Sequence, residues 1–396
     1  MAPIGSNPNV DYDSIVVGAS PTSLFEAAAM AEAGKRVLVV DRSDKVGGAW
    51  STLSFEDLGT VECGTHYLVD LPNVYPFMEE LPGLVLTPLE PPPEYVLARS
   101  ILGFRRVSFT RKWGSQVSPR LYRGEFSWRS LRNLISPYYR SAMGILSPTP
   151  RRKPFKYIVG GTPALVESLE HVVRLGNFDL KLNGNLDSVE IDTISSLVKC
   201  RVNGDMVCSG ELFVPGSAKL THVLINGIDT HLPGEFIENV QVHFLVDGAK
   251  EKKMSFVQFS GSEFAKMASD LTEFYRPNTE RPNSRLLSAY IPSDVPRTRS
   301  TVEAIIAELK EAGLLEEQAR LVDFYWTLVE LPQRSREELD KISNLGQGLI
   351  RTLYTHSFSM AVSHNAAKWQ PAIQEITSSF EAESSNPLSN AEYGKA

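Results

Sequence analysis

Cysteine is scarce in this sequence, and long apolar runs are missing. The 396 residues include three cysteines, Cys63, Cys200 and Cys208. Three thiols are too few for a structural zinc site of four thiolates, and so low a content is typical of a reducing compartment. No stretch approaches the roughly 18 unbroken apolar residues of a membrane-spanning helix, and the first residues lack the apolar core of a signal peptide. We therefore expect a cytoplasmic protein without a transmembrane segment.

Acidic residues are nearly absent from one segment, 99–156, although the chain as a whole is acidic. This segment holds 14 Lys and Arg residues and one acid, Glu125, whereas the whole chain has a net charge of −7. A focused positive field attracts anionic ligands. The alternatives are a solvated basic face, a face buried against an acidic surface of another subunit or, because aromatic residues are interleaved, a nucleic-acid surface. No nucleic-acid-binding motif accompanies the charge, so we expect a small anionic substrate and no nucleic acid.

Metal-binding and nucleophile motifs are also missing. The seven histidines form no pair at metal-ligand spacing and no cluster with cysteine, so we expect no metal. No Gly-x-Ser-x-Gly or comparable context singles out a serine nucleophile. A candidate cofactor site lies near the N-terminus.

Residues 13–41 have the pattern of a β-α-β unit. A short apolar run ends at Gly18, a helix-forming stretch follows Pro21 and stops before Gly34, and a second apolar run ends at Asp41. About 30 residues is the length of one half of a dinucleotide-binding domain. The turn between strand and helix aims backbone N–H groups at a pyrophosphate. An acid after the second strand accepts hydrogen bonds from ribose hydroxyls and argues against a 2′-phosphate.

The glycine pattern of this turn is incomplete. Dinucleotide-binding turns have the form Gly-x-Gly-x-x-Gly, whereas here Gly18 is kept and the other two glycines are replaced by Ser20 and Ser23. A Cβ at the first of these serines obstructs a pyrophosphate, and one at the second pushes the helix from the strand. Their hydroxyls offer compensating contacts to phosphate oxygens. An α/β unit that binds no nucleotide remains the alternative.

The residues after the second strand resemble the FAD-binding flavoproteins of the glutathione-reductase type, in which an acid, a spacer and a Gly-Gly pair follow that strand. Residues 62–67 and 157–169 are similar to segments of the amine oxidase, protoporphyrinogen oxidase and UDP-galactopyranose mutase branch. The resemblance implies FAD as cofactor. It predicts FAD contacts at Gly18, Ala19, Ser20, Pro21, Thr22, Asp41, Arg42, Gly47, Gly48, Ala49 and Trp50.

The same resemblance implies an α/β fold with a Rossmann-like FAD-binding domain of three layers (ββα) and a second, mixed α+β substrate domain. The FAD-binding domain is expected in three parts, and the substrate domain in the two insertions between them. The expected bounds are 10–75, 157–230 and 325–375 for the FAD-binding parts, 76–156 and 231–324 for the substrate domain, and 376–396 for a polar tail.

The resemblance also implies roles for single residues. His66 is expected near the flavin as the catalytic candidate, and a hydrogen-bonded structural histidine is the alternative. Leu186 is expected near the adenine, and Arg351 near the pyrophosphate. Substrate contacts are expected from Arg105, Arg106, Arg111, Arg120, Arg123 and Tyr354.

Three functions follow as hypotheses. The first is an FAD-dependent oxidoreductase that takes a hydride from a small anionic metabolite. The second is a mutase-like flavoprotein acting on a nucleotide-linked sugar, favoured by the basic segment and by Arg351. The third is a non-catalytic binding protein on the same fold, like the Rab GDP-dissociation inhibitors, favoured by the two serines. The chain lacks the Gly-Asp that oxidases of this family carry near the C-terminus, and an oligomer is compatible with every one of these hypotheses.

Overall fold

The computed structural model of the chain divides into two compact units. Unit 1 comprises Met1–Thr87, Tyr157–Gln241 and Thr327–Ala396, and unit 2 comprises Pro88–Lys156 and Val242–Trp326. That they are an FAD-binding and a substrate domain stays a prediction. The structure describes residues 10–55, 59–64, 66–89, 95–100, 103–108, 155–251, 253–260, 262–275, 284–355 and 358–385.

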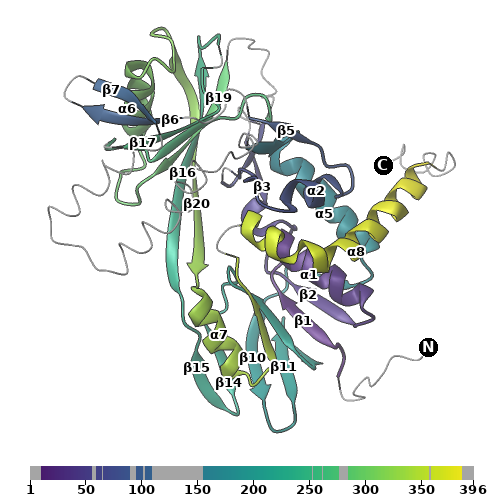
Figure 1. The fold of residues 1–396 in the computed structure, drawn as a ribbon. Helices are drawn as coiled ribbons and strands as arrows, with labels where there is room; N and C mark the ends of the chain where they lie inside the picture. Colours follow the sequence, from purple (N-terminus) through teal and green to yellow (C-terminus); the bar gives the residue numbers. More distant parts are fainter. Residues whose placement is uncertain are drawn as a thin grey trace, which may run out of the picture. The chain divides into compact units, whose positions relative to one another are not determined.

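A parallel five-stranded sheet forms the centre of unit 1, in the order β21-β13-β1-β2-β9 (Figure 1). Its strands are short and mostly buried, as expected of a sheet covered on both faces. The strands are β1 (Ser14–Val17), β2 (Val37–Val40), β9 (Asp179–Lys181), β13 (Leu212–Pro215) and β21 (Ile350–Leu353).

The first two strands and helix α1 (Pro21–Glu32) confirm the predicted β-α-β unit. Pro21 occupies the first helical position, where its missing N–H costs nothing. The helix ends at Glu32. Ala33 is its C-cap residue, and Gly34 follows with a positive φ of 82°. Pro21 and Gly34 therefore mark the two ends of this helix in the sequence.

A second sheet, in the order β12-β11-β10-β14-β15, covers one face of the parallel sheet. Side chains that alternate along the parallel strands, such as Ile15 and Leu212, pack against Val189 and Cys200 of this layer. Strands β11 and β12 pair antiparallel across a turn at Asn203–Gly204. The strands are β10 (Leu186–Asp192), β11 (Leu197–Val202), β12 (Asp205–Ser209), β14 (His222–Ile225) and β15 (Ile228–His231).

Helices cover the opposite face of the parallel sheet. Val16, Val39 and Phe213 of the sheet belong to one core with Phe25 and Trp369 of the helices. Unit 1 is thus a helix layer, a parallel sheet and a second sheet, which confirms the predicted three-layer architecture. The helices besides α1 are α2 (Val74–Glu79), α5 (Gly161–Leu175) and α8 (Phe358–Ser384).

Unit 2 is built on a seven-stranded sheet in the order β20-β16-β19-β18-β17-β6-β7. The boundary between the units falls within its two longest strands, β16 and β20. The elements are β6 (Tyr95–Ser100), β7 (Gly103–Ser108), β16 (Glu235–Asp247), β17 (Phe256–Ser260), β18 (Met267–Asp270), β19 (Arg285–Ile291), α6 (Arg299–Glu311) and β20 (Arg320–Gln333).

The C-terminal helix α8 extends into the segment that was expected to be a polar tail. The polar tail was expected from 376 on, but the helix continues to Ser384 because its last turns have partners. Ile376 is buried, and the Thr377 hydroxyl donates to the carbonyl oxygen of Glu80 at 2.6 Å.

None of the helices in the described stretches is long and apolar enough to cross a membrane. The remaining elements are η1 (Gly48–Trp50), β3 (Thr52–Phe55), β4 (Gly59–Glu62), β5 (Leu86–Pro88), β8 (Lys156–Ile158) and α7 (Arg336–Leu345).

A buried arginine holds the segment between β13 and β14 in place. The guanidinium of Arg334, which is 4% exposed, donates to the carbonyl oxygens of Pro233 at 2.9 Å, Ala218 at 2.7 Å, Leu220 at 2.6 Å and Gly216 at 3.3 Å. Burial lowers the pKa of this guanidinium. The four carbonyl oxygens replace the water that the buried cation has lost.

Replacing this cation will destabilise unit 1. Arg334→Leu leaves four inward-facing carbonyl oxygens without their donor, so we expect the free energy of unfolding to fall by about 3 kcal/mol or more. Urea denaturation followed by circular dichroism measures the loss. The control is Arg336→Leu, two residues further on at an exposed position of α7. Equal midpoints for the two variants would contradict the role of the buried guanidinium.

Candidate functional site

The turn between β1 and α1 gathers three hydroxyl groups at the N-terminus of the helix. Ser20 is the N-cap residue of α1, and its Oγ accepts a hydrogen bond from the backbone N–H of Ser23 at 3.3 Å. The same oxygen lies 2.8 Å from Ser23 Oγ and 3.2 Å from Thr22 Oγ1. An N-cap serine stabilises a helix by satisfying a free N–H group. Ser20 therefore has a structural role at the place of the missing glycine, and its Cβ is accommodated.

Asp41 binds this turn from the end of the neighbouring strand β2. Its Oδ2 accepts a hydrogen bond from the backbone N–H of Ala19 at 2.5 Å, and its Oδ1 accepts one from the N–H of Ser43 at 2.7 Å. A Cβ placed on Gly18 would lie 3.8 Å from Asp41 Oδ2. Each carboxylate oxygen can accept more than one hydrogen bond. The acid thus lies beside the turn, with further acceptor capacity.

The Gly47–Gly48 pair passes directly over the turn. The N–H of Gly47 donates to the carbonyl oxygen of Ala19 at 2.9 Å, and a Cβ on Gly48 would lie 3.4 Å from the Cβ of Ser20. Both glycines have positive φ angles, 110° and 58°, which residues with a Cβ rarely adopt. The structure therefore brings together the three parts of the predicted FAD site, namely the turn, the acid and the Gly-Gly loop. Arg42 on this loop is exposed.

A cluster of aromatic and acidic side chains continues from the Gly-Gly loop. The indole of Trp50 stacks on the imidazole of His66, with ring centroids 4.0 Å apart and planes 25° apart. His66 Nδ1 lies 3.6 Å from Oε2 of Glu62, which is fully buried and also accepts a hydrogen bond from the hydroxyl of Tyr157. Tyr157 lies 95 residues after Glu62 in the chain, so sequence spacing did not reveal it as the partner of this carboxylate.

The other predicted contacts lie elsewhere. Leu186 begins β10, and Tyr354 follows β21; both pack against the core between the two sheets. Arg105 and Arg106 lie on β7 of unit 2. Arg111, Arg120 and Arg123 are outside the described residues.

Arg351, the predicted pyrophosphate contact, lies on β21 and pairs with two carboxylates. It is the second residue of β21 and is level with Phe213 of β13 and with Val16, which lies two residues before Gly18. Its guanidinium lies 3.5 Å from Glu26 Oε1 and 3.4 Å from Glu211 Oε1. The same two carboxylates also pair with Lys368 and Lys35, so two anions are shared among three cations. The contact of Arg351 with a pyrophosphate stays a prediction.

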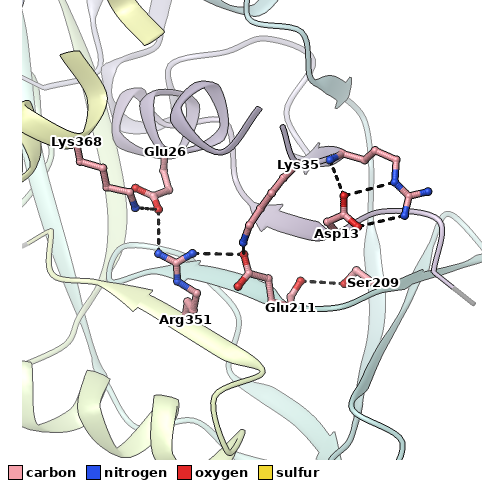
Figure 2. A network of polar contacts seen from close by, with 8 residues as sticks. Asp13, Glu26, Lys35, Ser209, Glu211, Arg351 and Lys368 are labelled. Carbon is pink, nitrogen blue, oxygen red and sulfur yellow. Dashed lines mark hydrogen bonds and ion pairs between the residues drawn. The ribbon is translucent and has the colours of Figure 1, made fainter. Parts of the chain in front are cut away.

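Glu26 is the centre of this ion-pair network and was not predicted (Figure 2). Its carboxylate on α1 is buried, pairs with Lys368 Nζ and Arg351, and accepts a hydrogen bond from Trp369 Nε1 at 2.9 Å. Glu211 extends the network to Lys35 at 2.8 Å. The network ties α1 to α8 and β21, which lie more than 320 residues later in the chain.

The comparisons with known proteins agree with this architecture. A family model described as an NAD(P)-binding Rossmann-like domain matches residues 16–81. No curated protein sequence matches the chain. Cyclohexylamine oxidase from Brevibacterium oxydans superposes with a TM-score of 0.62 and 14% identity, over 94% of this chain and 100% of that one. The fold of the two chains is the same.

Two further solved structures share it. A putrescine oxidase bound to putrescine has a TM-score of 0.58 and 16% identity, and the match covers 95% of this chain and 99% of that chain. A reduced UDP-galactopyranose mutase has a TM-score of 0.59 and 13% identity, and the match covers 97% of each chain. The predicted resemblance to the amine oxidase and mutase branch is confirmed as a likeness of fold.

Removing the central carboxylate will weaken the attachment of α8 to α1. Glu26→Gln leaves Lys368 and Arg351 without a buried anion, and we expect the free energy of unfolding to fall by about 1–3 kcal/mol, because both cations are partly exposed. Thermal and urea denaturation measure the change. The control is Glu303→Gln, which breaks the exposed pair with Arg299 on α6 and is expected to cost less than about 1 kcal/mol. A loss no larger than that of the control would contradict the account.

Proposed function

We propose that the chain binds FAD in unit 1 and is an FAD-dependent oxidoreductase acting on a small metabolite. The observation that carries the proposal is the direct contact between the Gly18–Ser20 turn, Asp41 and the Gly47–Gly48 loop. FAD supplies an electron acceptor, because its flavin takes up a hydride from the substrate. The protein contributes binding, orientation and exclusion of water.

The donors at the turn suit a pyrophosphate. The free backbone N–H groups at the N-terminus of α1 and the hydroxyl of the partly exposed Ser20, with Thr22 beside it, are proposed donors for phosphate oxygens. Asp41 is an acceptor for ribose hydroxyls. The remaining proposed contacts are Ala19, Pro21, Arg42, Ala49, Trp50 and, at the adenine, Leu186.

His66 is the proposed catalytic residue because of what surrounds it. Its imidazole is held between the indole of Trp50 and the buried carboxylate of Glu62, so its orientation is restricted. A histidine fixed in this way can hold or transfer a proton at Nε2 while Nδ1 faces the carboxylate. Tyr157 binds the same carboxylate and positions it.

The proposed substrate is anionic, and the basic segment 99–156 supports this choice. Eleven of its 14 basic residues are arginines, whose planar guanidinium groups suit two-pronged contacts with phosphate or carboxylate. Arg105, Arg106, Arg111, Arg120 and Arg123 are the proposed contacts, with Tyr354 as a further one.

Two other functions are supported by particular observations. The mutase matches this chain over as large a share as the oxidases do, which supports a rearrangement of a nucleotide-linked sugar without net oxidation. A binding protein that has lost FAD is supported by the internal hydrogen bonds of Ser20 and Asp41, which occupy part of the polar surface of the turn. A flavin absorption spectrum separates this last function from the other two.

FAD binding will depend on Asp41. Asp41→Ala removes the acceptor for the ribose, and we expect FAD affinity to fall by about 1–3 kcal/mol, or roughly five- to 150-fold. Titration of flavin-free protein with FAD, followed by flavin absorbance and fluorescence, measures the dissociation constant. The control is Asp44→Ala, an exposed acid on the same loop. A wild-type chain that binds no FAD, or two variants of equal affinity, would contradict the proposal.

Anion binding will depend on the arginines of β7. The double variant Arg105→Glu and Arg106→Glu reverses two charges, and we expect pyrophosphate binding to weaken about tenfold or more and to lose part of its salt dependence. Calorimetry at low and high salt measures both effects. The control reverses Arg297 and Arg320, two exposed arginines of the same unit. Unchanged binding and salt dependence in the β7 variant would remove these arginines from the proposed substrate site.

A further inference from the structure

The edge hairpin of the second sheet brings two histidines together. Strands β14 and β15 pair antiparallel, and His222 stands directly opposite His231. The two imidazole centroids are 4.9 Å apart, and the ring planes are inclined by 58°. The histidines are nine residues apart in the sequence, so their pairing depends on the turn at Asn226–Gly227. Spacing along the chain, on which the expectation of no metal rested, does not reveal such a pair.

The distance between their nitrogens matches that of two ligands on one metal ion. His222 Nε2 lies 3.3 Å from His231 Nδ1. Two nitrogens bound at about 2.0–2.1 Å to a tetrahedral ion are roughly 3.3–3.4 Å apart. Both can therefore bind one ion with little movement of the hairpin. In the absence of an ion, a proton shared between the two nitrogens accounts for the same distance.

Asp229 orients His222 so that its Nε2 is free to bind a metal ion. Asp229 Oδ1 lies 3.3 Å from His222 Nδ1, and both side chains are more than half exposed. An Nδ1–H that donates to the carboxylate places the lone pair of His222 on Nε2, which faces His231. Metal-ligating histidines commonly donate their other N–H to a carboxylate in this way, and the carboxylate raises ligand basicity.

We propose that His222 and His231 form a surface site for one divalent transition-metal ion, with Asp229 as the positioning residue. The described residues contain no group of three or more His, Cys, Asp or Glu side chains placed to hold a metal. Water therefore completes the coordination, and imidazole ligands favour Cu²⁺ over Ni²⁺ and Zn²⁺. The ion would link β14 to β15 at the sheet edge. The site uses no residue of the proposed FAD site and does not depend on it.

The test uses the full chain, without a histidine tag, in a buffer that does not bind metals. Calorimetric titration with CuCl₂ and with ZnCl₂ at neutral pH is expected to give one ion per chain at this site, with tighter binding of Cu²⁺. The electron paramagnetic resonance spectrum of the Cu²⁺ complex is expected to show two nitrogen ligands. Saturating metal is expected to raise the melting temperature, because the ion binds only the folded hairpin.

Variants assign the site. His222→Gln and His231→Gln are each expected to abolish this binding, and Asp229→Asn to weaken it about 10- to 100-fold. The control is His364→Gln, an exposed lone histidine on α8, which is expected to change nothing. Two results would overturn the proposal: absence of Cu²⁺ binding in the wild-type chain, or binding that survives in both hairpin variants. Circular dichroism checks that each variant folds.

Discussion

The carboxylate of Glu26 is the contact that joins the first helix of unit 1 to the last helix and to the edge strand β21. It lies in the first helix after the nucleotide turn, and its partners Lys368 and Trp369 lie in the last helix of the chain. A buried carboxylate is costly unless it is paired, and here cations and an indole N–H pair it. The contact therefore fixes α1 against α8 and, through Arg351, against β21. It also fixes the direction of α1, and with it the direction of the free N–H groups at its N-terminus.

The nucleotide turn shows how an incomplete glycine pattern is accommodated. At the place of the second glycine, Ser20 caps the helix through its hydroxyl, and Gly48 supplies the close approach on the other side of the turn. Glycine is found at 47 and 48, where the backbone has positive φ angles. Serine is found where a side-chain oxygen can satisfy a helix N–H. The Ser20 hydroxyl at this turn can also donate a hydrogen bond to a phosphate oxygen.

The sequence predicts what depends on neighbours along the chain. Apolar runs, Pro21, Gly34 and the Asn203–Gly204 turn locate strands, helices and a hairpin within a few residues. It does not predict contacts between distant segments. The network of Glu26, the pairing of Glu62 with Tyr157 and the four carbonyl partners of Arg334 all join residues about 95 or more positions apart. The prediction for Arg351 came from the motif near it, whereas its two carboxylate partners lie 140 or more positions away in the sequence.

The central claim is that the Gly18–Ser23 turn, Asp41 and the Gly-Gly loop together bind an adenine dinucleotide. A crystal structure of the chain soaked or co-crystallised with FAD tests it most directly. The account predicts the pyrophosphate at the N-terminus of α1, within hydrogen-bond distance of the Ser20 hydroxyl, and a ribose hydroxyl on the carboxylate of Asp41. Electron density for FAD elsewhere, or none at saturating FAD with the Ser20 and Asp41 contacts unchanged, would contradict it.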